Sequence, residues 1–301
     1  MSMRYLAGFI SAFYNPLKVP DAPTIGTATG GNVSASVTFT APANVGGGAI
    51  SGYSVVSTPG NVIGTGTSSP ITVSGLTNGT AYTFKVFATN VYGPSLFSAA
   101  SNSVTPALPI GAAYGGGYYA GQISTAGNGI ADYNLVVGPK ASAQNTSKQF
   151  KIVNTGGDPT SVIDGPTNSA TMNSAVYPAA EFCEGLTIGG FSDWYCPAQN
   201  ELEICYYNLK PSTNANFTGS GINANAVPAR ASNYTSGTPA QTSAVDFQTG
   251  GVETFPLAVY WSSTQRSASY GWANYFTTGN QYTYRLKDSV RSVRAIRRVA
   301  V

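Results

Sequence analysis

Short runs of alternating hydrophobic and polar residues fill the chain between residues 20 and 107. β-Branched and aromatic residues are common in these runs, as in half-buried strands; the runs are Val33–Thr40, Gly52–Ser57, Ile71–Val73, Ala81–Asn90 and Asn102–Val104. Turn signals separate them, namely Gly46-Gly47-Gly48, Pro59-Gly60 and Asn78-Gly79. About seven strands in a segment of this length predict a two-sheet β-sandwich over 20–107.

A different pattern begins after residue 122. Apolar residues at helical spacing predict two helices, Asn173–Leu186 and Pro197–Leu209. Strands are predicted at Tyr133–Val137, Gln149–Val153, Val259–Ser263, Trp272–Thr277, Tyr282–Leu286 and Val290–Val299. The segment 211–254 is rich in Asn, Ala, Thr and Ser and has little regular pattern. We therefore expect an α+β domain over 123–301, joined to the sandwich by a Gly- and Ala-rich linker, 108–122.

Residues 1–19 carry large apolar side chains in a segment too short to bury them by itself. They are Tyr5, Leu6, Phe9, Ile10, Phe13 and Tyr14. Such residues mark an interaction site when exposed, so we expect a docking arm. A signal peptide is a weaker alternative, because Gly8 and Ser11 interrupt the apolar run; a frayed terminus is the third. No stretch approaches the roughly 18 apolar residues of a membrane span, so membrane insertion is not expected.

Charged residues make up only 9% of the chain, against roughly 25% in an average soluble protein. A chain poor in charge and rich in Gly, Ser, Thr, Asn and Tyr is typical of an extracellular or particle-surface protein. The net charge is +3, and six of the 15 basic residues lie between Arg285 and Arg298. This small and local excess argues against a nucleic-acid partner.

The sequence contains no histidine. That removes the usual general base, the commonest metal ligand and every Ser-His or Cys-His arrangement. The 12 acidic residues form no recognisable catalytic pair. Cys183, Cys196 and Cys205 are odd in number and lack metal-site spacing, so we expect buried small hydrophobic residues. The expectation is a protein that is not an enzyme and has no cofactor and no metal.

Several motifs of the first domain occur in a familiar order. They are Pro20-Asp21-Ala22-Pro23, Phe39, the stretch 47–55, Gly75-Leu76-Thr77-Asn78-Gly79-Thr80-Ala81-Tyr82, and Ser101 to Pro106. In this order they closely resemble a fibronectin type III domain. The resemblance implies a β-sandwich with a tyrosine corner, in which the Tyr82 hydroxyl holds the corner backbone. Such modules are mostly spacers.

Three stretches of the second domain also stand out together. They are Ala180–Leu186 followed by Gly189–Trp194; Pro197 with Glu201-Leu202; and Tyr260–Thr264 with Trp272, Phe276 and Val290–Arg297. The set resembles the C-type-lectin-like domain found at the C-terminus of bacterial collagen-like adhesins and in many tailed-phage virion proteins. Core positions are then expected for Trp194, Trp261 and Trp272, with ligand platforms as the alternative. Asp193 is expected to cap a turn or pair with an arginine of the final strand.

The calcium and sugar signatures of true C-type lectins are absent. Trp272-Ala273-Asn274 is the nearest approach, and it lacks the acidic residue. Binding of a sugar without metal stays open, and the segment 265–287 has the Tyr, Arg, Asn and Gln residues that would serve it. The candidate ligand-binding residues are Arg266, Tyr270, Tyr275, Asn280, Gln281, Tyr282, Tyr284 and Arg285. Alternation along the strands places Tyr275, Tyr282 and Tyr284 outward and Trp272 inward. An ordinary polar hairpin is the alternative.

A docking arm, a fibronectin type III spacer and a lectin-like tip together resemble a virion structural protein of a tailed phage. We expect a fibre, or a decoration protein of tail or capsid, located at the virion surface. Its partners would be other virion proteins, further copies of this chain, and a host-surface glycan or protein. A purely architectural cement protein is the first alternative, and a bacterial cell-surface adhesin is the second.

Overall fold

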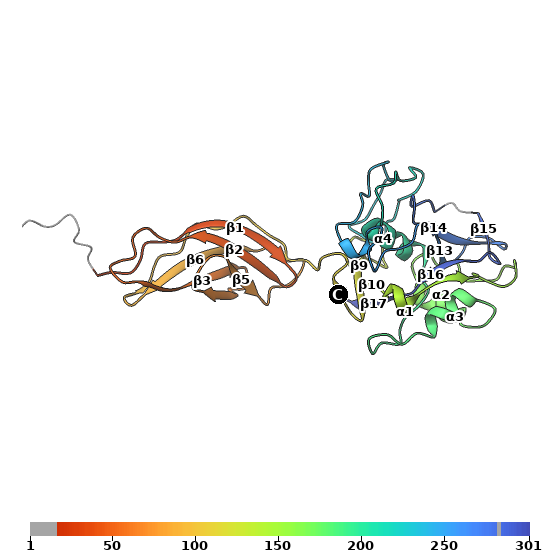
Figure 1. Ribbon diagram of the computed structural model, residues 1–301, viewed down its shortest axis with the longest axis horizontal. Helices are drawn as coiled ribbons and strands as arrows, with labels where there is room; N and C mark the ends of the chain where they lie inside the picture. The colour runs from red at the N-terminus through yellow and green to blue at the C-terminus, as the bar shows by residue number, and fades with distance from the viewer. Residues whose placement is uncertain (1–16, 282–283) are drawn as a thin grey trace, which may run out of the picture. The chain divides into compact units, whose positions relative to one another are not determined.

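The computed structural model describes residues 17–281 and 284–301. The chain is mainly β and divides into two compact units, Met1–Pro109 and Ile110–Val301 (Figure 1). Seven of the residues predicted to make contacts lie outside the described residues: Tyr5, Leu6, Phe9, Ile10, Phe13, Tyr14 and Tyr282. Their predicted roles stay predictions.

The N-terminal unit consists of two antiparallel sheets. One sheet has the order β1 (Thr24–Gly31), β2 (Ser34–Thr40), β5 (Ile71–Ser74). The other has the order β4 (Ile63–Gly66), β3 (Ile50–Thr58), β6 (Thr83–Asn90), β7 (Gly93–Pro94). Alternate residues of these strands are buried, so the period-two pattern of the sequence forms the core between the sheets.

The predicted tyrosine corner is present. The Tyr82 hydroxyl oxygen accepts a hydrogen bond from the backbone N–H of Thr77 at 3.1 Å. Phe39 is buried, and its ring centroid lies 4.7 Å from that of Tyr53. The contact between Phe39 and Tyr53 joins one sheet to the other. The predicted β-sandwich is confirmed.

The C-terminal unit contains two five-stranded sheets. The first has the order β12-β9-β10-β17, with β8 paired to β9; these are β8 (Ala113–Tyr114), β9 (Gly117–Ile123), β10 (Tyr133–Val137), β12 (Ala226–Val227) and β17 (Ile296–Ala300). The second has the order β11 (Gln144–Lys148), β16 (Arg291–Arg294), β13 (Val259–Gln265), β14 (Tyr270–Tyr275), β15 (Arg285–Leu286).

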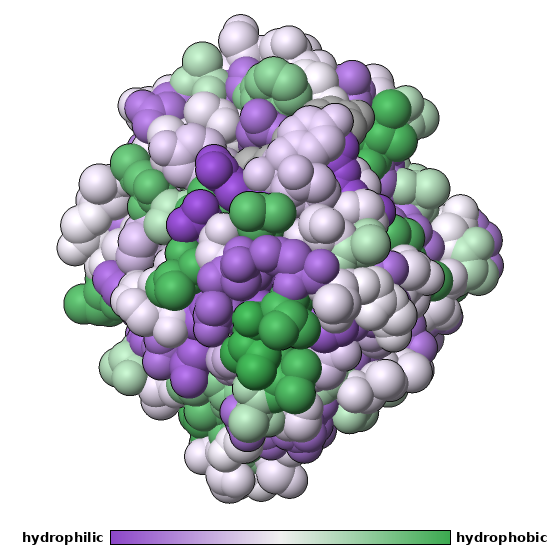
Figure 2. Space-filling view, turned by 90° about the vertical axis from the view of Figure 1, so that its right-hand side faces the viewer, coloured by the Kyte–Doolittle hydropathy of each residue, from purple (hydrophilic) through white to green (hydrophobic). Residues whose placement is uncertain are grey.

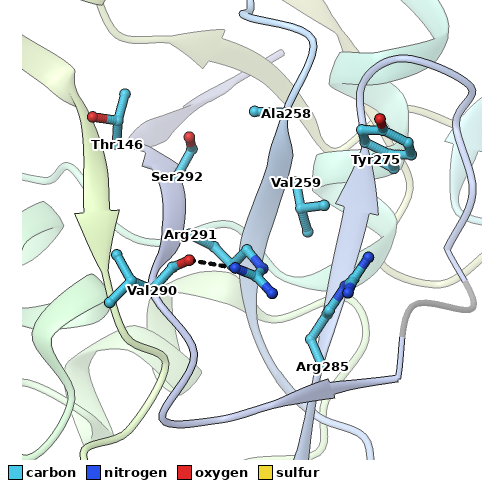
Figure 3. Close-up of a pocket in the computed structure, with 8 residues that line it drawn as sticks. All are labelled: Thr146, Ala258, Val259, Tyr275, Arg285, Val290, Arg291 and Ser292. Carbon is cyan, nitrogen blue, oxygen red and sulfur yellow. Dashed lines mark hydrogen bonds between the residues drawn. The ribbon is translucent and has the colours of Figure 1, made fainter.

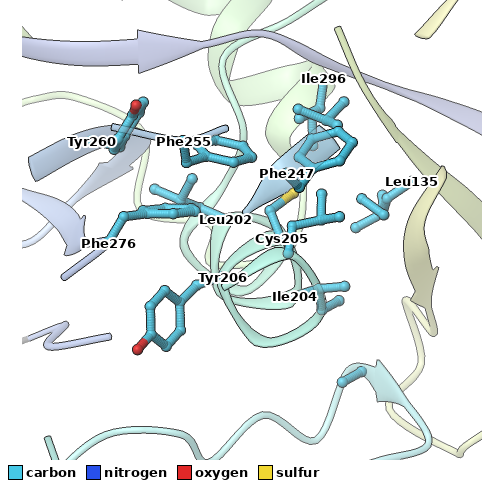
Figure 4. Close-up of a cluster of buried hydrophobic side chains, with 14 of the residues drawn as sticks. Leu135, Leu202, Ile204, Cys205, Tyr206, Phe247, Phe255, Tyr260, Phe276 and Ile296 are labelled. Atoms are coloured by element: carbon cyan, nitrogen blue, oxygen red, sulfur yellow. The ribbon is translucent and has the colours of Figure 1, made fainter. Parts of the chain in front are cut away.

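Helix α4 (Gln199–Leu209) is the longest helix described and contacts strands of both sheets. Its side chains Leu202, Cys205 and Tyr206 are buried in one cluster, which Figure 4 shows with the surrounding aromatic rings. The ring centroids of Phe255 and Phe276 are 4.3 Å apart in this cluster. The cluster thus joins the helix, Tyr260 of β13, Phe276 after the end of β14 and the segment after residue 210 in one core.

The second cluster of this unit contains Trp194 and Trp261, both fully buried. Cys183 and Cys196 belong to it as well, and Cys205 is buried in the first cluster. The core assignment of these two tryptophans and the buried position of all three cysteines are confirmed. Trp272, by contrast, is only half-buried, so its predicted place in the core is wrong.

The predicted Gly- and Ala-rich linker 108–122 is not a separate linker, because β8 and most of β9 lie within it. Glycine serves close packing here. Gly115 and Gly116 form the turn with φ of +55° and +82°. A Cβ at Gly117 would collide with the carbonyl oxygen of Val137 on β10. The glycine-rich composition therefore reflects a tight turn and a close backbone approach.

The helices also differ from the two that were expected. Described besides α4 are α1 (Lys140–Ala143), α2 (Gly165–Thr171), α3 (Pro178–Glu184) and the short 3₁₀ helix Val245–Phe247. The predicted helix from Asn173 begins only at Pro178, because proline is tolerated in a first helical turn but not further inside. Helix α2 was missed, although Asp164 caps it by accepting from the Thr167 N–H.

Two strand predictions also need correction. The strand pairing with β16 is Gln144–Lys148, and Gln149–Val153 is not a strand. The predicted strand Val290–Val299 is two strands, β16 and β17, which belong to different sheets and are separated at Ala295. These strands carry arginines of the C-terminal segment. Because β16 and β17 belong to different sheets, their arginine side chains lie in different surroundings.

Candidate functional site

Four of the six basic residues between Arg285 and Arg298 form ion pairs. Their nitrogen–oxygen distances are 2.6 Å for Lys287–Asp158, 2.6 Å for Arg294–Glu253, 2.7 Å for Arg297–Asp193 and 2.8 Å for Arg298–Glu201. The expected pairing of Asp193 with an arginine of the final strand is confirmed. Most of the basic side chains of this segment are therefore paired with acidic side chains and stabilise the fold.

Asp158 is the centre of the most buried of these groups. It accepts from Lys151 at 2.7 Å, from Lys287 at 2.6 Å and from the Tyr177 hydroxyl at 2.8 Å. Burial acts to raise the pKa of Asp158, but these hydrogen bonds outweigh it and lower that pKa overall. The carboxylate is thus held in its charged form.

Arg285 and Arg291 are the two basic residues of this segment for which no ion pair is found in the described part of the chain. Within residues 17–281 and 284–301, no carboxylate forms an ion pair with either guanidinium. The Nε atoms of both are buried and have no hydrogen-bond partner among those residues. Burial and then the charge of Arg285 lower the pKa of Arg291, so the two positive groups are close enough to repel.

Both side chains line an open cavity of about 380 Å³ at the end of the second sheet. The rest of the lining is Thr146, Ala258, Val259, Tyr275, Val290 and Ser292. Figure 3 shows the two guanidinium groups reaching toward the strands that carry Val259 and Tyr275, and the bond from Arg291 to the Val290 carbonyl oxygen at 2.7 Å. Three hydroxyl groups and two cations thus border the cavity.

An aromatic and cationic cluster lies near the cavity. The guanidinium carbon of Arg266 is 3.8 Å from the ring centroid of Tyr284 and 4.9 Å from that of Trp272. The rings of Tyr270 and Tyr284 meet edge to face at 5.8 Å. Tyr284 is 68% exposed, so the cluster offers an aromatic surface to a ligand. The hydrophobic residues of the face seen in Figure 2 form small groups among polar ones.

The structure thus divides the candidate residues between two faces of β14. Residues 270, 272 and 274 share one face, and residues 271, 273 and 275 share the other. Arg266, Tyr270 and Tyr284 gather at the first face, and Tyr275 and Arg285 line the cavity at the second. The prediction that Tyr275 points outward together with Tyr284 is wrong, because Tyr275 is half-buried in the cavity wall.

Gln281 and Asn280 complete the candidate set. Gln281 is buried and lines a small pocket of about 130 Å³ with Trp272, Gln199 and Ser220. The Asn280 carbonyl oxygen accepts from the Tyr275 N–H at 3.1 Å and helps to close the turn after β14. Asn280 therefore supports the turn, while Gln281 borders a polar hollow on the Trp272 face.

Arg291, Thr146 and Ser292 are lining residues that the sequence did not mark as ligand-binding. Arg291 was recognised only as an arginine of the final strand. The useful signal was the imbalance in that segment, since Asp288 is the one acid among six bases. In the described part of the chain, no group of three Cys, Asp or Glu residues could hold a metal ion. No described helix is long and apolar enough to span a membrane.

These features define a two-domain chain, a β-sandwich followed by a unit of two sheets and short helices. Residues 21–104 match the family model of the fibronectin type III domain, and residues 148–297 match that of the Lcl C-terminal domain. The two matches lie one after the other along the chain, and they are consistent with the expected fibronectin type III domain followed by a lectin-like domain.

Comparison with solved structures gives similarities of limited extent. The titin kinase with its flanking domains is 30% identical, with a TM-score of 0.27; 30% of this chain and 17% of that chain are covered. Domains A168–A170 of titin are 31% identical, with a TM-score of 0.27 and coverage of 29% and 32%. A titin module from human cardiac muscle is 28% identical, with a TM-score of 0.24 and coverage of 30% and 91%. This chain thus spans less than a third of the first two. No curated protein matches.

Proposed function

We propose that this protein is a surface adhesin of a phage particle, a fibre or a decoration protein of tail or capsid. The C-terminal unit is its binding tip, and the fibronectin type III domain is its spacer. The presence of a fibronectin type III domain and an Lcl C-terminal domain in one chain suggests a surface or adhesion-type protein. The N-terminal arm would dock on other virion proteins, and the ligand would be a glycan or protein of the host surface.

The observation that carries this proposal is the gathering of Arg266, Tyr270 and Tyr284 around half-buried Trp272. Exposed aromatic rings and guanidinium groups dominate binding energy at recognition surfaces. Rings also stack on the apolar faces of sugars, and neighbouring amides such as Gln281 hydrogen-bond to hydroxyl groups. The role proposed is binding without catalysis, and without cofactor or metal.

The experiment is attachment of the fluorescently labelled full chain to a panel of bacterial strains. Tyr284→Ala is expected to abolish attachment at an unchanged melting temperature, because this side chain is largely exposed. Tyr92→Ala is the matched control, since Tyr92 is an exposed tyrosine of the N-terminal unit. Equal attachment by both variants would overturn the assignment of the tip.

The two alternative functions, an architectural cement protein and a bacterial cell-surface adhesin, predict different results in this experiment. An architectural cement protein would attach to no strain, and antibody labelling would still find it on purified phage particles. A bacterial cell-surface adhesin would be found on the cells that produce it. Labelling of particles and of producing cells therefore separates the three.

A further inference from the structure

Two unpaired positive charges in one partly buried cavity need a physical reason. Every other arginine described after residue 284 is paired with a carboxylate, and Arg285 and Arg291 are not. Placing like charges close together in a desolvated site costs free energy. A bound anion would remove this cost by neutralising both groups.

The cavity walls carry no acid that could supply this anion from within. The lining consists of two arginines, three hydroxyl side chains and three apolar residues. Asp288 is close in sequence, but it is exposed and forms no ion pair with either arginine among the described residues. No carboxylate of the lining neutralises the two guanidinium groups, so the cavity leaves them available to an anion of another molecule.

We infer that this cavity binds the carboxylate group of an acidic sugar, such as a uronic acid unit of a surface polysaccharide. A guanidinium presents its N–H groups as a planar fork that matches the two oxygens of a carboxylate. The buried Nε atoms of Arg285 and Arg291, which have no partner among the described residues, are donors of this kind. This inference rests on the proposed adhesive function and names the class of ligand.

The remaining lining favours a sugar as the carrier of the carboxylate. The cavity, at about 380 Å³, is larger than a simple inorganic anion needs and lies in the size range of small-molecule sites. The hydroxyls of Thr146, Tyr275 and Ser292 can exchange hydrogen bonds with sugar hydroxyls. Val259 and Val290 offer apolar contact to the C–H face of a ring.

The test is calorimetric titration of the full chain with trigalacturonate, with neutral trigalactose and with a peptide of three glutamates. Trigalacturonate is expected to bind about tenfold more tightly than the other two. Arg291→Gln and Arg285→Gln are each expected to weaken this binding by about tenfold or more. Lys85→Gln removes the same charge at an exposed site of the N-terminal unit and is expected to change the affinity by no more than about twofold.

Three results would overturn the inference: equal binding of the neutral sugar, tighter binding of the peptide, or equal effects of the Lys85 and Arg285 substitutions. Melting temperatures show whether each variant folds. If Arg291→Gln does not fold, the affinity of Arg285→Gln for trigalacturonate tests the inference, because Arg285 is half-buried. Parallel attachment assays separate the two proposals. Attachment without trigalacturonate binding refutes only the carboxylate site, while trigalacturonate binding without attachment to any strain refutes only the adhesin.

Discussion

Asp193 and Arg297 form a two-bond ion pair that joins the segment before α4 to the last strand. Arg297 Nε and Nη2 donate to Asp193 Oδ1 and Oδ2 at 2.7 and 2.9 Å. The same guanidinium donates to the Gly115 carbonyl oxygen at 2.9 Å and lies 3.8 Å from the Phe191 ring centroid. One arginine thus holds three parts of the C-terminal unit together.

Asp193→Ala is expected to lower the free energy of unfolding by about 1–2 kcal/mol, because charge-assisted hydrogen bonds to a largely buried guanidinium are lost. Urea unfolding followed by tryptophan fluorescence measures this, since all three tryptophans lie in the C-terminal unit. Asp193→Asn keeps one acceptor and should lose less. Identical stability of wild type and Asp193→Ala would show that the pair contributes nothing.

Asp158 should make the C-terminal unit sensitive to acid. Its pKa is lower in the folded than in the unfolded chain, so it stabilises the fold above its unfolded pKa of about 4. That contribution is lost as the pH falls through the folded pKa. Asp158→Asn should be less stable than wild type at pH 7 and lose less stability below about pH 4. Asp246→Asn, at an exposed site, is the control and should follow wild type. If the stability of Asp158→Asn and that of wild type change with pH in the same way, the charged form of Asp158 is not the cause of the acid sensitivity.

Trp194 and Trp272 should differ in their effects on stability. Trp194→Ala empties a fully buried site and should cost about 3–5 kcal/mol. Trp272 is half-buried against Arg266, so Trp272→Ala should cost less than half of that. Urea unfolding followed by circular dichroism compares the two variants. If both variants lose the same free energy of unfolding, Trp272 contributes to stability like a core residue, as the sequence predicted.

The segment 110–123 can be tested through its glycines. Gly117→Ala should destabilise the C-terminal unit by about 1–3 kcal/mol, because the new methyl group meets the Val137 carbonyl oxygen. Gly237→Ala is a suitable control, since a Cβ at Gly237 has no neighbour within 4 Å among the described residues. If the Gly117→Ala variant is as stable as the Gly237→Ala control, the close approach of Gly117 to Val137 does not contribute to stability, and the prediction of a linker over 108–122 is supported instead.

Chelation by EDTA should leave the melting temperature of the full chain unchanged, and so should added calcium. The sequence has no histidine, and no described group of acids and cysteines is arranged to hold an ion. A ligand that binds only the folded state raises its stability, so removing an overlooked metal would lower the melting temperature. A drop of several degrees on chelation would reveal such a site.

The features that could be predicted from the amino-acid sequence are those that depend on local pattern and on familiar motifs. Alternation along 20–107 predicted the sandwich. The resemblance of the Gly75–Tyr82 motif to a tyrosine corner predicted that the Tyr82 hydroxyl holds the corner backbone, and its partner there is the Thr77 N–H. Helical spacing predicted a helix over Pro197–Leu209. Helix α4 begins two residues later, at Gln199, and ends at Leu209 as predicted. These features arise from interactions between residues close in sequence, or from a face that must be buried.

Which charged side chains form ion pairs, and which stay unpaired, depends on how distant parts of the chain fold together. Lys287 meets Asp158 and Arg298 meets Glu201 across more than ninety residues of chain, and no local pattern encodes such partners. The break at Ala295 and the close approach of Gly117 to Val137 likewise depend on how distant strands pack. Arg285 and Arg291 stand out only after those pairings are known, because an unpaired charge is a property of the folded surroundings and not of the residue.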